Sequence, residues 1–222
     1  MDFSGPEPAD FANVESLNHA FLLQLRGVSL GQQLRQELPQ SVQIMVRGLT
    51  DLQIERLSAT PFLLLSLRES DAGYWRDLCS DDRNAGLFVA VDQDTESGHL
   101  SAAALAFLWQ LALRNPYAAR LVSGASLSWC EQLADGTLLR LLQRATGRRD
   151  LLQPRLAGNT EFWNKLLGPG LSSEQEVRRA AHLAALQVVL TGDPAIQYQP
   201  LRAAACRSLA PSRQVADRNR RR

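Results

Sequence analysis

The chain has 222 residues, 45% of them hydrophobic, with 24 basic and 23 acidic side chains and a formal net charge of +1. Its 39 Leu and 28 Ala against 3 Ile and 11 Val exclude an all-β protein, because Leu and Ala favour helices and β-branched residues favour strands. No run approaches the ~18 uncharged apolar residues of a bilayer span, and the first residues lack the pattern of a secretory signal. We therefore expect a cytoplasmic helical protein with no membrane partner.

The first half of the chain is predicted to be a helical unit. Residues 1–12 are rich in proline and acidic side chains, and we expect them to be flexible. Residues 13–79 follow as the first helical repeat, in which Pro39 ends one helix and Thr50 and Gln53 have the spacing of a capping box at the start of another. The predicted helices cover residues 14–26, 29–38 and 41–47, a segment after Thr50, and a turn or two around Tyr74 to Leu78.

The middle of the chain is largely polar. Residues 80–98 are predicted to be a linker or long loop, because polar residues flank both of its ends. The stretch from Leu87 to Val91 is the one convincing strand-like segment, and a single strand does not form a sheet alone.

Residues 99–192 are predicted to be a second helical repeat. It opens with the most regular helical pattern of the chain, residues 100–114, which Asn115-Pro116 ends. A long last helix, residues 173–190, has capping-box spacing at Ser173 and Glu176. Shorter helices are predicted at 117–122, 127–134, 137–145 and 160–167. Residues 193–222 are basic and contain proline, and we expect them to be mostly disordered.

Three sequence blocks recur in order in the two halves. Leu17–Arg26 matches Leu105–Arg114, Leu49–Leu57 matches Leu133–Leu141, and the pair Tyr74-Trp75 matches Phe162-Trp163. The blocks are 88, 84 and 88 residues apart. They predict an all-α protein of two tandem, related helical repeats packed as a pseudo-dimer, as in a two-fold homodimer. The alternative is a chance similarity between Leu-rich helices.

Motifs that carry enzyme chemistry are absent from the sequence. It has no phosphate-binding glycine loop, nucleophile elbow or zinc-protease helix, and Asp92-x-Asp94-x-Glu96 lacks the glycine and final glutamate of a calcium loop. We expect Cys130 to be a buried structural thiol, His182 to be exposed to solvent, and the four tryptophans to pack in the core. The sequence therefore predicts no enzyme, no catalytic or cofactor-binding residue and no bound metal.

Positive charge is concentrated at the C-terminal end. Residues 201–222 contain seven Arg and one Asp, a net charge of +6, so residues 1–200 carry −5. Lysine occurs once, at Lys165. The arginine excess is explained either by nucleic-acid binding, since guanidinium groups suit phosphate, or by the codon usage of a G+C-rich genome. The candidate nucleic-acid contacts are Arg213, Arg218, Arg220, Arg221 and Arg222, with a solvated end as the alternative.

The first half carries three blocks with a family pattern. Leu17–Leu23 fits a hydrophobic-Asn-x-x-aromatic-Leu-Leu helix, Leu49–Thr60 fits Leu-Thr-x-x-Gln-x-x-x-Leu-x-x-Thr, and Phe62 to Arg68 fits an apolar run that ends on Arg. In these blocks the chain resembles the FlhD-type subunit of the bacterial flagellar master regulator. The family's cysteine in the apolar run falls on Leu64 or Leu65 here, so no intersubunit disulfide is expected, and the family chain is shorter and not duplicated.

The resemblance implies an all-helical bacterial subunit that assembles with a protein partner at promoters. Two functions follow as expectations: a non-enzymatic, transcription-regulatory subunit whose C-terminal segment contacts nucleic acid, or an interaction adaptor that does not meet DNA. The acidic balance of residues 1–200 favours the adaptor, because DNA-binding surfaces are usually basic.

Overall fold

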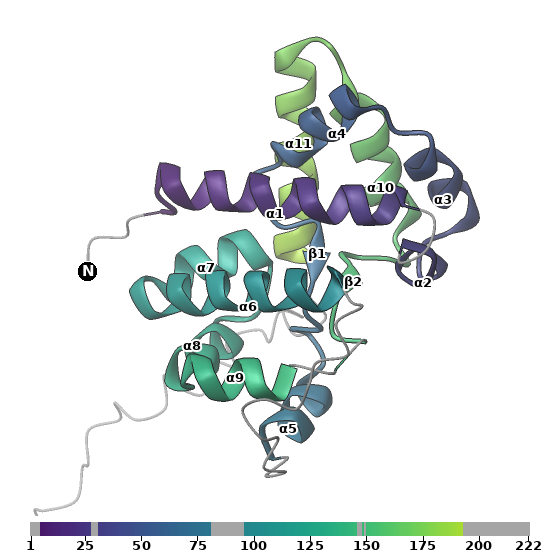
Figure 1. Ribbon diagram of the computed structural model, residues 1–222. Coiled ribbons are helices and arrows are strands. Elements are labelled where there is room, and N and C mark those ends of the chain that lie inside the picture. The colour runs from purple at the N-terminus through teal and green to yellow at the C-terminus, as the bar shows by residue number, and fades with distance from the viewer. Residues whose placement is uncertain (1–4, 28–30, 81–95, 146–147, 149, 193–222) are drawn as a thin grey trace, which may run out of the picture.

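The structure is a computed structural model that describes residues 5–27, 31–80, 96–145, 148 and 150–192. Helices dominate this part of the chain, and the predicted all-α class is confirmed (Figure 1). In chain order the elements are α1 (Pro8–Arg26), α2 (Gly31–Gln36), α3 (Gln40–Arg47), α4 (Asp51–Ser58), β1 (Leu65–Ser66), α5 (Ala72–Ser80), α6 (Glu96–Arg114), α7 (Pro116–Ser123), α8 (Leu127–Asp135), α9 (Leu138–Ala145), β2 (Gln153–Pro154), α10 (Thr160–Leu167), the 3₁₀ helix η1 (Pro169–Leu171) and α11 (Gln175–Thr191).

Local capping explains most helix starts. The predicted capping box at Thr50 is confirmed: the Thr50 hydroxyl accepts from the Gln53 backbone N–H, and the Gln53 side chain accepts from the Thr50 N–H. Three predicted starts are wrong. Helix α6 begins at Glu96, four residues before the predicted start at residue 100. Helix α1 begins at Pro8 inside the segment expected to be flexible, because Glu7 and Asp10 form an acidic capping box. Helix α11 begins after Glu174 without the predicted Ser173 cap.

The order of elements in the first half recurs in the second. Each half runs through one 19-residue helix, three short helices, a short strand and a helix that carries a tryptophan. Helices α1 and α6 start 88 residues apart, and so do β1 and β2 and the helices α5 and α10. Helices α4 and α9 start 87 residues apart, so the predicted match of Leu49–Leu57 with Leu133–Leu141, at 84, does not fit the helix positions.

The two halves face each other in an antiparallel arrangement. Strand β1 pairs with β2 antiparallel, with Leu65 opposite Pro154 and Ser66 opposite Gln153. Helices α1 and α6 pack side by side, and the Asp10 carboxylate near the start of α1 bonds Arg114 at the end of α6 (Figure 1). If residues 88 positions apart are equivalent, Leu65 pairs with the equivalent of Ser66, and Ser66 pairs with the equivalent of Leu65. A two-fold axis between the strands produces this pattern.

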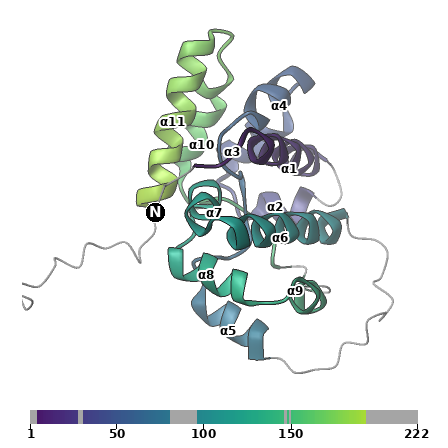
Figure 2. The same ribbon diagram turned by 90° about the vertical axis from the view of Figure 1, so that its left-hand side faces the viewer.

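The last helix of each repeat, α5 or α10, packs against helices of the other half. Helix α5, from the first half, lies against α8 and α9 of the second, where the rings of Trp75 and Trp129 meet edge to face with centroids 5.2 Å apart (Figure 2). Helix α10, from the second half, packs against α3 of the first. The predicted repeats at 13–79 and 99–192 therefore share one hydrophobic core.

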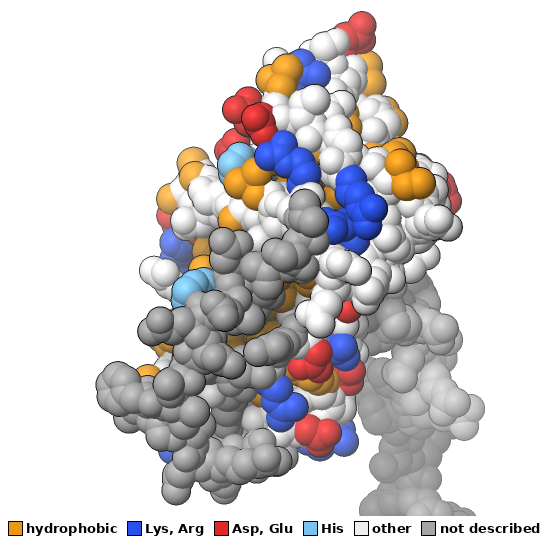
Figure 3. All heavy atoms as spheres, turned by 45° about the vertical axis from the view of Figure 1, so that its right-hand side comes forward, with side chains coloured by type: hydrophobic (Ala, Val, Ile, Leu, Met, Phe, Trp, Pro, Cys, Tyr) orange, Lys and Arg blue, Asp and Glu red, His pale blue; other side chains and the backbone are white. Residues whose placement is uncertain are grey.

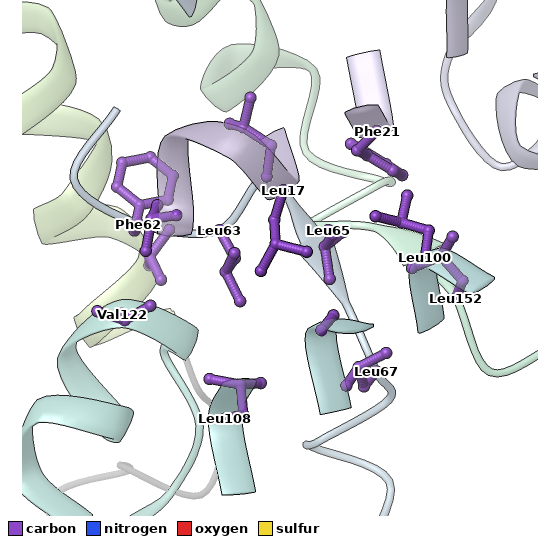
Figure 4. Packing of buried hydrophobic residues seen from close by; sticks show 14 of the residues in the cluster. Leu17, Phe21, Phe62, Leu63, Leu65, Leu67, Leu100, Leu108, Val122 and Leu152 are labelled. Atoms are coloured by element: carbon purple, nitrogen blue, oxygen red, sulfur yellow. The ribbon is translucent and has the colours of Figure 1, made fainter. Parts of the chain in front are cut away.

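The centre of that core is the apolar run that precedes and includes β1. Leu63 and Leu65 are fully buried and lie between α1 on one side and α6 and α7 on the other (Figure 4). The Leu63 N–H also bonds the Val122 carbonyl at the end of α7, at 2.9 Å. This run passes through the interior of the molecule, which explains its lack of a polar face.

Helix α11 and η1 follow the recurring elements and pack on α10. The other end of α11 reaches Gly124, a left-handed residue with φ of +67°, where an added Cβ atom would lie 2.3 Å from the Val189 side chain. The predicted linker 80–98 is too long at both ends, because α5 reaches Ser80 and α6 begins at Glu96. The strand-like segment 87–91 is outside the described residues. No helix in the described ranges is long and apolar enough to cross a membrane.

Candidate functional site: the seam between the two halves

The residues predicted to contact nucleic acid are Arg213, Arg218, Arg220, Arg221 and Arg222, and all five lie outside the described residues. The structure instead brings together side chains from both halves around β1 and β2. We call residues 62–69 and 150–157, with the side chains packed directly on them, the seam.

The backbone of the seam has the same geometry on both sides. The Trp75 indole N–H donates to the Leu67 carbonyl at 3.1 Å, and the Trp163 indole N–H donates to the Arg155 carbonyl at 3.0 Å. Arg68 and Leu156, the next residues in each half, both have a left-handed backbone with φ of 54° and 47°. These are the only non-glycine residues with positive φ in the described ranges, and they are 88 residues apart.

An ion pair joins the halves inside the seam. Arg155 Nη1 lies 2.6 Å from Glu69 Oε1, and the two side chains are only 7% and 6% exposed. The remaining polar atoms are also engaged: Arg155 donates to the Leu63 and Leu65 carbonyls at 2.5 and 2.6 Å, and Glu69 Oε2 accepts from the Ser66 hydroxyl and the Leu67 N–H at 2.7 Å. The Oε1 contact with Arg155 is an ion pair without hydrogen-bond geometry, and this charge pairing offsets the burial of both groups.

A buried amide holds the first half of the seam against α1. Asn18 is fully buried, and its Nδ2 donates to the Phe62 carbonyl at 2.8 Å while its Oδ1 accepts from the Leu64 N–H at 2.8 Å. The same Nδ2 also reaches the Thr60 hydroxyl and the Ser58 carbonyl. Asn18 therefore satisfies backbone groups of a segment that has little sheet pairing of its own.

A partly exposed polar cluster covers the rim of the seam. The Tyr74 hydroxyl donates to Asp150 Oδ1 at 3.2 Å, and the Arg68 guanidinium lies over the Tyr74 ring, 5.1 Å from its centroid. Burial and the neighbouring Asp150 carboxylate together raise the pKa of Tyr74 to about 12. Tyr74 therefore stays protonated and acts here as a hydrogen-bond donor between the halves.

The histidine and cysteine candidates have structural environments. The prediction that His182 is exposed is wrong: the ring is buried, and Nε2 lies 3.1 Å from the Gly170 carbonyl in η1, which the sequence pattern of α11 alone does not reveal. Burial lowers the pKa of His182. The prediction that Cys130 is buried is confirmed, and burial raises the pKa of its thiol to about 12, which leaves it protonated at neutral pH.

The predicted core position of the tryptophans is confirmed for Trp75, Trp129 and Trp163, and Trp109 is partly buried with its N–H on the Gly136 carbonyl. Among the described residues, no three His, Cys, Asp or Glu side chains are arranged to hold a metal ion.

A second surface, outside the seam, exposes apolar side chains. Where Arg114 bonds Asp10, the neighbouring residues Phe11 and Leu113 are 36% and 52% exposed, and Tyr117 follows at the start of α7. We call these three residues the α1–α6 corner. On the face that Figure 3 shows, hydrophobic side chains form small groups among basic and acidic ones.

Sequence reasoning missed Glu69 and Arg155, and it placed Asn18 in a family pattern without giving it a structural role. The signal for Arg155 is a charged residue inside the otherwise uncharged stretch 151–160, and the signal for Glu69 is its position directly after the buried run that ends at Arg68.

The chain matches no family model, no curated protein and no solved structure.

Proposed function

We propose that this chain is a non-enzymatic bacterial regulatory protein, built as a fused pseudo-dimer of two related helical repeats, that acts through a protein partner at promoters. The observation that carries the proposal is the α1–α6 corner, where exposed apolar side chains from both halves are sequence neighbours of Asp10 and Arg114, and Arg114 pairs with both Asp10 and Glu7. Exposed apolar side chains on a folded helical scaffold are a common basis for protein association.

The assignment of buried polar groups supports a binding role over a catalytic one. Glu69 pairs with Arg155, Asn18 bonds the backbone of the run before β1, and His182 bonds the Gly170 carbonyl. Cys130 is a buried, protonated thiol. A catalytic centre needs titratable groups that converge on a pocket where substrate binds. In the described ranges these groups hold helices and strands together instead.

The resemblance to the FlhD-type subunit supports the promoter part of the proposal through the fold. The first two matching blocks fall on α1 and α4, which pack against each other, and the third falls on the run that includes β1. Leu17, Leu22 and Ile54 from the first two blocks are buried. The matching residues are therefore mainly core residues of the first half. The likeness supports a shared architecture and, through it, a shared way of assembling with a partner.

The partner-binding test uses two leucines of nearly equal exposure. Leu113→Glu changes the α1–α6 corner, where the wild-type side chain is 52% exposed, and Leu139→Glu changes α9, where it is 55% exposed. We expect Leu113→Glu to weaken binding of a partner captured from cells at least about tenfold, because it places a charge in the interface. Leu139→Glu is the control. Equal binding by both variants, with unchanged thermal unfolding, would contradict the proposed surface.

DNA binding is tested separately with the full chain, alone and with its captured partner. Deletion of residues 211–222 removes Arg213, Arg218 and Arg220–Arg222. We expect it to weaken DNA binding equally on all sequences, and to lower the slope of log affinity against log salt by about 0.9 for each phosphate that these arginines neutralise. An absence of DNA affinity at low salt would favour the adaptor function, to which the −5 net charge of residues 1–200 already points.

A further inference from the structure

The recurrence of the seam at an offset of 88 residues assigns each seam residue a counterpart in the other half. Arg155 stands where the first half has Leu67, because both residues offer their carbonyl to the tryptophan eight positions later. Glu69 stands where the second half has Ala157. The buried ion pair therefore has no copy on the opposite side of the two-fold arrangement, where Leu67 and Ala157 are apolar.

This asymmetry has different consequences for the three ways in which halves can pair. When the first half meets the second, one carboxylate meets one guanidinium at 2.6 Å. When two first halves meet in the same geometry, each Glu69 faces Leu67, and two buried carboxylates have no cationic partner. When two second halves meet, each Arg155 faces Ala157, and two buried guanidinium groups have no anionic partner. An unpaired buried charge is strongly unfavourable.

We propose that the Glu69–Arg155 pair makes the seam surface of each half selective for the other half and unfavourable for pairing with a like half. The backbones of the two surfaces are related by the two-fold arrangement. The other ion pair across the seam, Arg68–Asp150, is 4.0 Å long and partly exposed, so the buried Glu69–Arg155 pair is the stronger barrier that keeps the first half from exchanging with the first half of another chain. The net charges of the halves agree with this selectivity. Residues 5–80 carry six basic and nine acidic side chains, and residues 96–192 carry ten basic and seven acidic ones.

The inference is independent of the proposed function, and its test needs no partner. A protease recognition sequence is inserted between residues 81 and 95 of the full chain, and the purified protein is cut there. The cut protein is unfolded in urea and refolded by dilution as one mixture. Native mass spectrometry then distinguishes the three pairs by mass, because the two pieces differ in length.

The expected result for the wild-type seam is at least a tenfold excess of mixed pairs over like pairs (an order-of-magnitude expectation for one specificity-determining charge pair). The variant Glu69→Ala with Arg155→Leu gives both halves the same Leu and Ala residues at this place, and its pairs are expected to approach random association. Glu69→Ala alone is expected to raise only the pairs of first halves, because Arg155 still disfavours pairs of second halves.

Two results would overturn the proposal. One is a near-random distribution of pairs from the wild-type protein, a measurement that does not depend on whether any variant folds. The other is an unchanged excess of mixed pairs in the refolded double variant, which would assign the selectivity to other residues of the seam.

Discussion

The first and second halves of this protein follow the same course with different polar interiors. Both place a long helix beside the run that enters the seam, and both anchor that run with a tryptophan N–H eight residues later. The first half adds Asn18 and Glu69, whereas the equivalent places in the second half hold Ala106 and Ala157. The backbone arrangement therefore does not require these polar groups. Asn18 bonds residues of its own half, whereas Glu69 bonds Arg155 and so joins the two halves.

The ends of the halves differ as well. The second half continues through η1 into α11, which packs on α10, while the first half ends with α5 and the chain continues toward α6. The added helix carries the buried His182 and meets the end of α7 at Gly124. The second half thus carries an extra layer, formed by η1 and α11.

The largest expected loss of stability comes from replacing Trp75 or Trp163, and comparing the two losses tests whether the tryptophans are equivalent. Trp75→Ala and Trp163→Ala each remove a buried ring with a bonded N–H, and each is expected to lower the free energy of unfolding by about 3–5 kcal/mol. Urea unfolding monitored by circular dichroism measures both. Leu139→Ala, at a half-exposed position, is the control and should change stability by less than about 0.5 kcal/mol. A near-neutral result at either tryptophan would break the equivalence.

The second prediction converts one half toward the other. Asn18→Ala gives α1 the residue that α6 has at position 106, and leaves the Leu64 N–H and the Phe62 carbonyl without their buried partner. We expect a loss of about 2–3 kcal/mol in the free energy of unfolding. Ser16→Ala, at an exposed serine of the same helix, is the matched control. If both substitutions have the same small effect, Asn18 does not hold the seam.

The third prediction concerns the extra layer. Gly124→Ala forces a left-handed alanine and places its Cβ atom against Val189, so we expect a loss of about 1–3 kcal/mol. Adding Val189→Ala should relieve the contact but not the backbone strain. Gly158→Ala is the control, because its added Cβ meets nothing within 4 Å. Equal unfolding temperatures for the two alanine variants would show that α11 does not pack at Gly124.

The smallest effect is a pH dependence from the same layer. Burial lowers the pKa of His182 in the folded protein below the value of about 6.5 in the unfolded chain. The unfolded chain therefore binds the proton more readily than the folded protein. The stability that the neutral His182 contributes above pH 6.5 is lost as the pH falls from 6.5 through the lower pKa of the folded state. Urea unfolding between pH 5 and 8 should therefore show a shallower pH dependence for His182→Gln than for wild type. His99→Gln, at an exposed histidine, should match wild type.

The sequence predicts the helices well because their ends are determined locally. Asn115-Pro116 breaks one helix and caps the next, and the predicted helix 160–167 has the observed bounds because Asn159 caps it. The predictions fail where a distant residue decides. The start of α1 is strengthened by Arg114, which binds Asp10 across 104 positions, and His182 is buried by η1.

The seam was not predictable in the same way. Glu69 and Arg155 are 86 positions apart, and they meet because β1 and β2 cross the interior as neighbours. Periodicity places residues on the face of one helix, but the partner of a charged residue in an apolar run depends on the packing of both halves. The recurring tryptophans did indicate the relation between the halves, since they mark the positions that bond the seam carbonyls.

A double-mutant cycle at Glu69 and Arg155 tests the central claim most directly. Glu69→Ala and Arg155→Leu are each expected to lower the free energy of unfolding of the uncut chain by about 3–5 kcal/mol, because each leaves one buried charge unpaired. The double variant is expected to be more stable than the sum of the two losses by about 2 kcal/mol or more, since it leaves neither charge behind. If the two losses instead add to within about 0.5 kcal/mol, the residues are not coupled, and selection of the seam by this ion pair is contradicted.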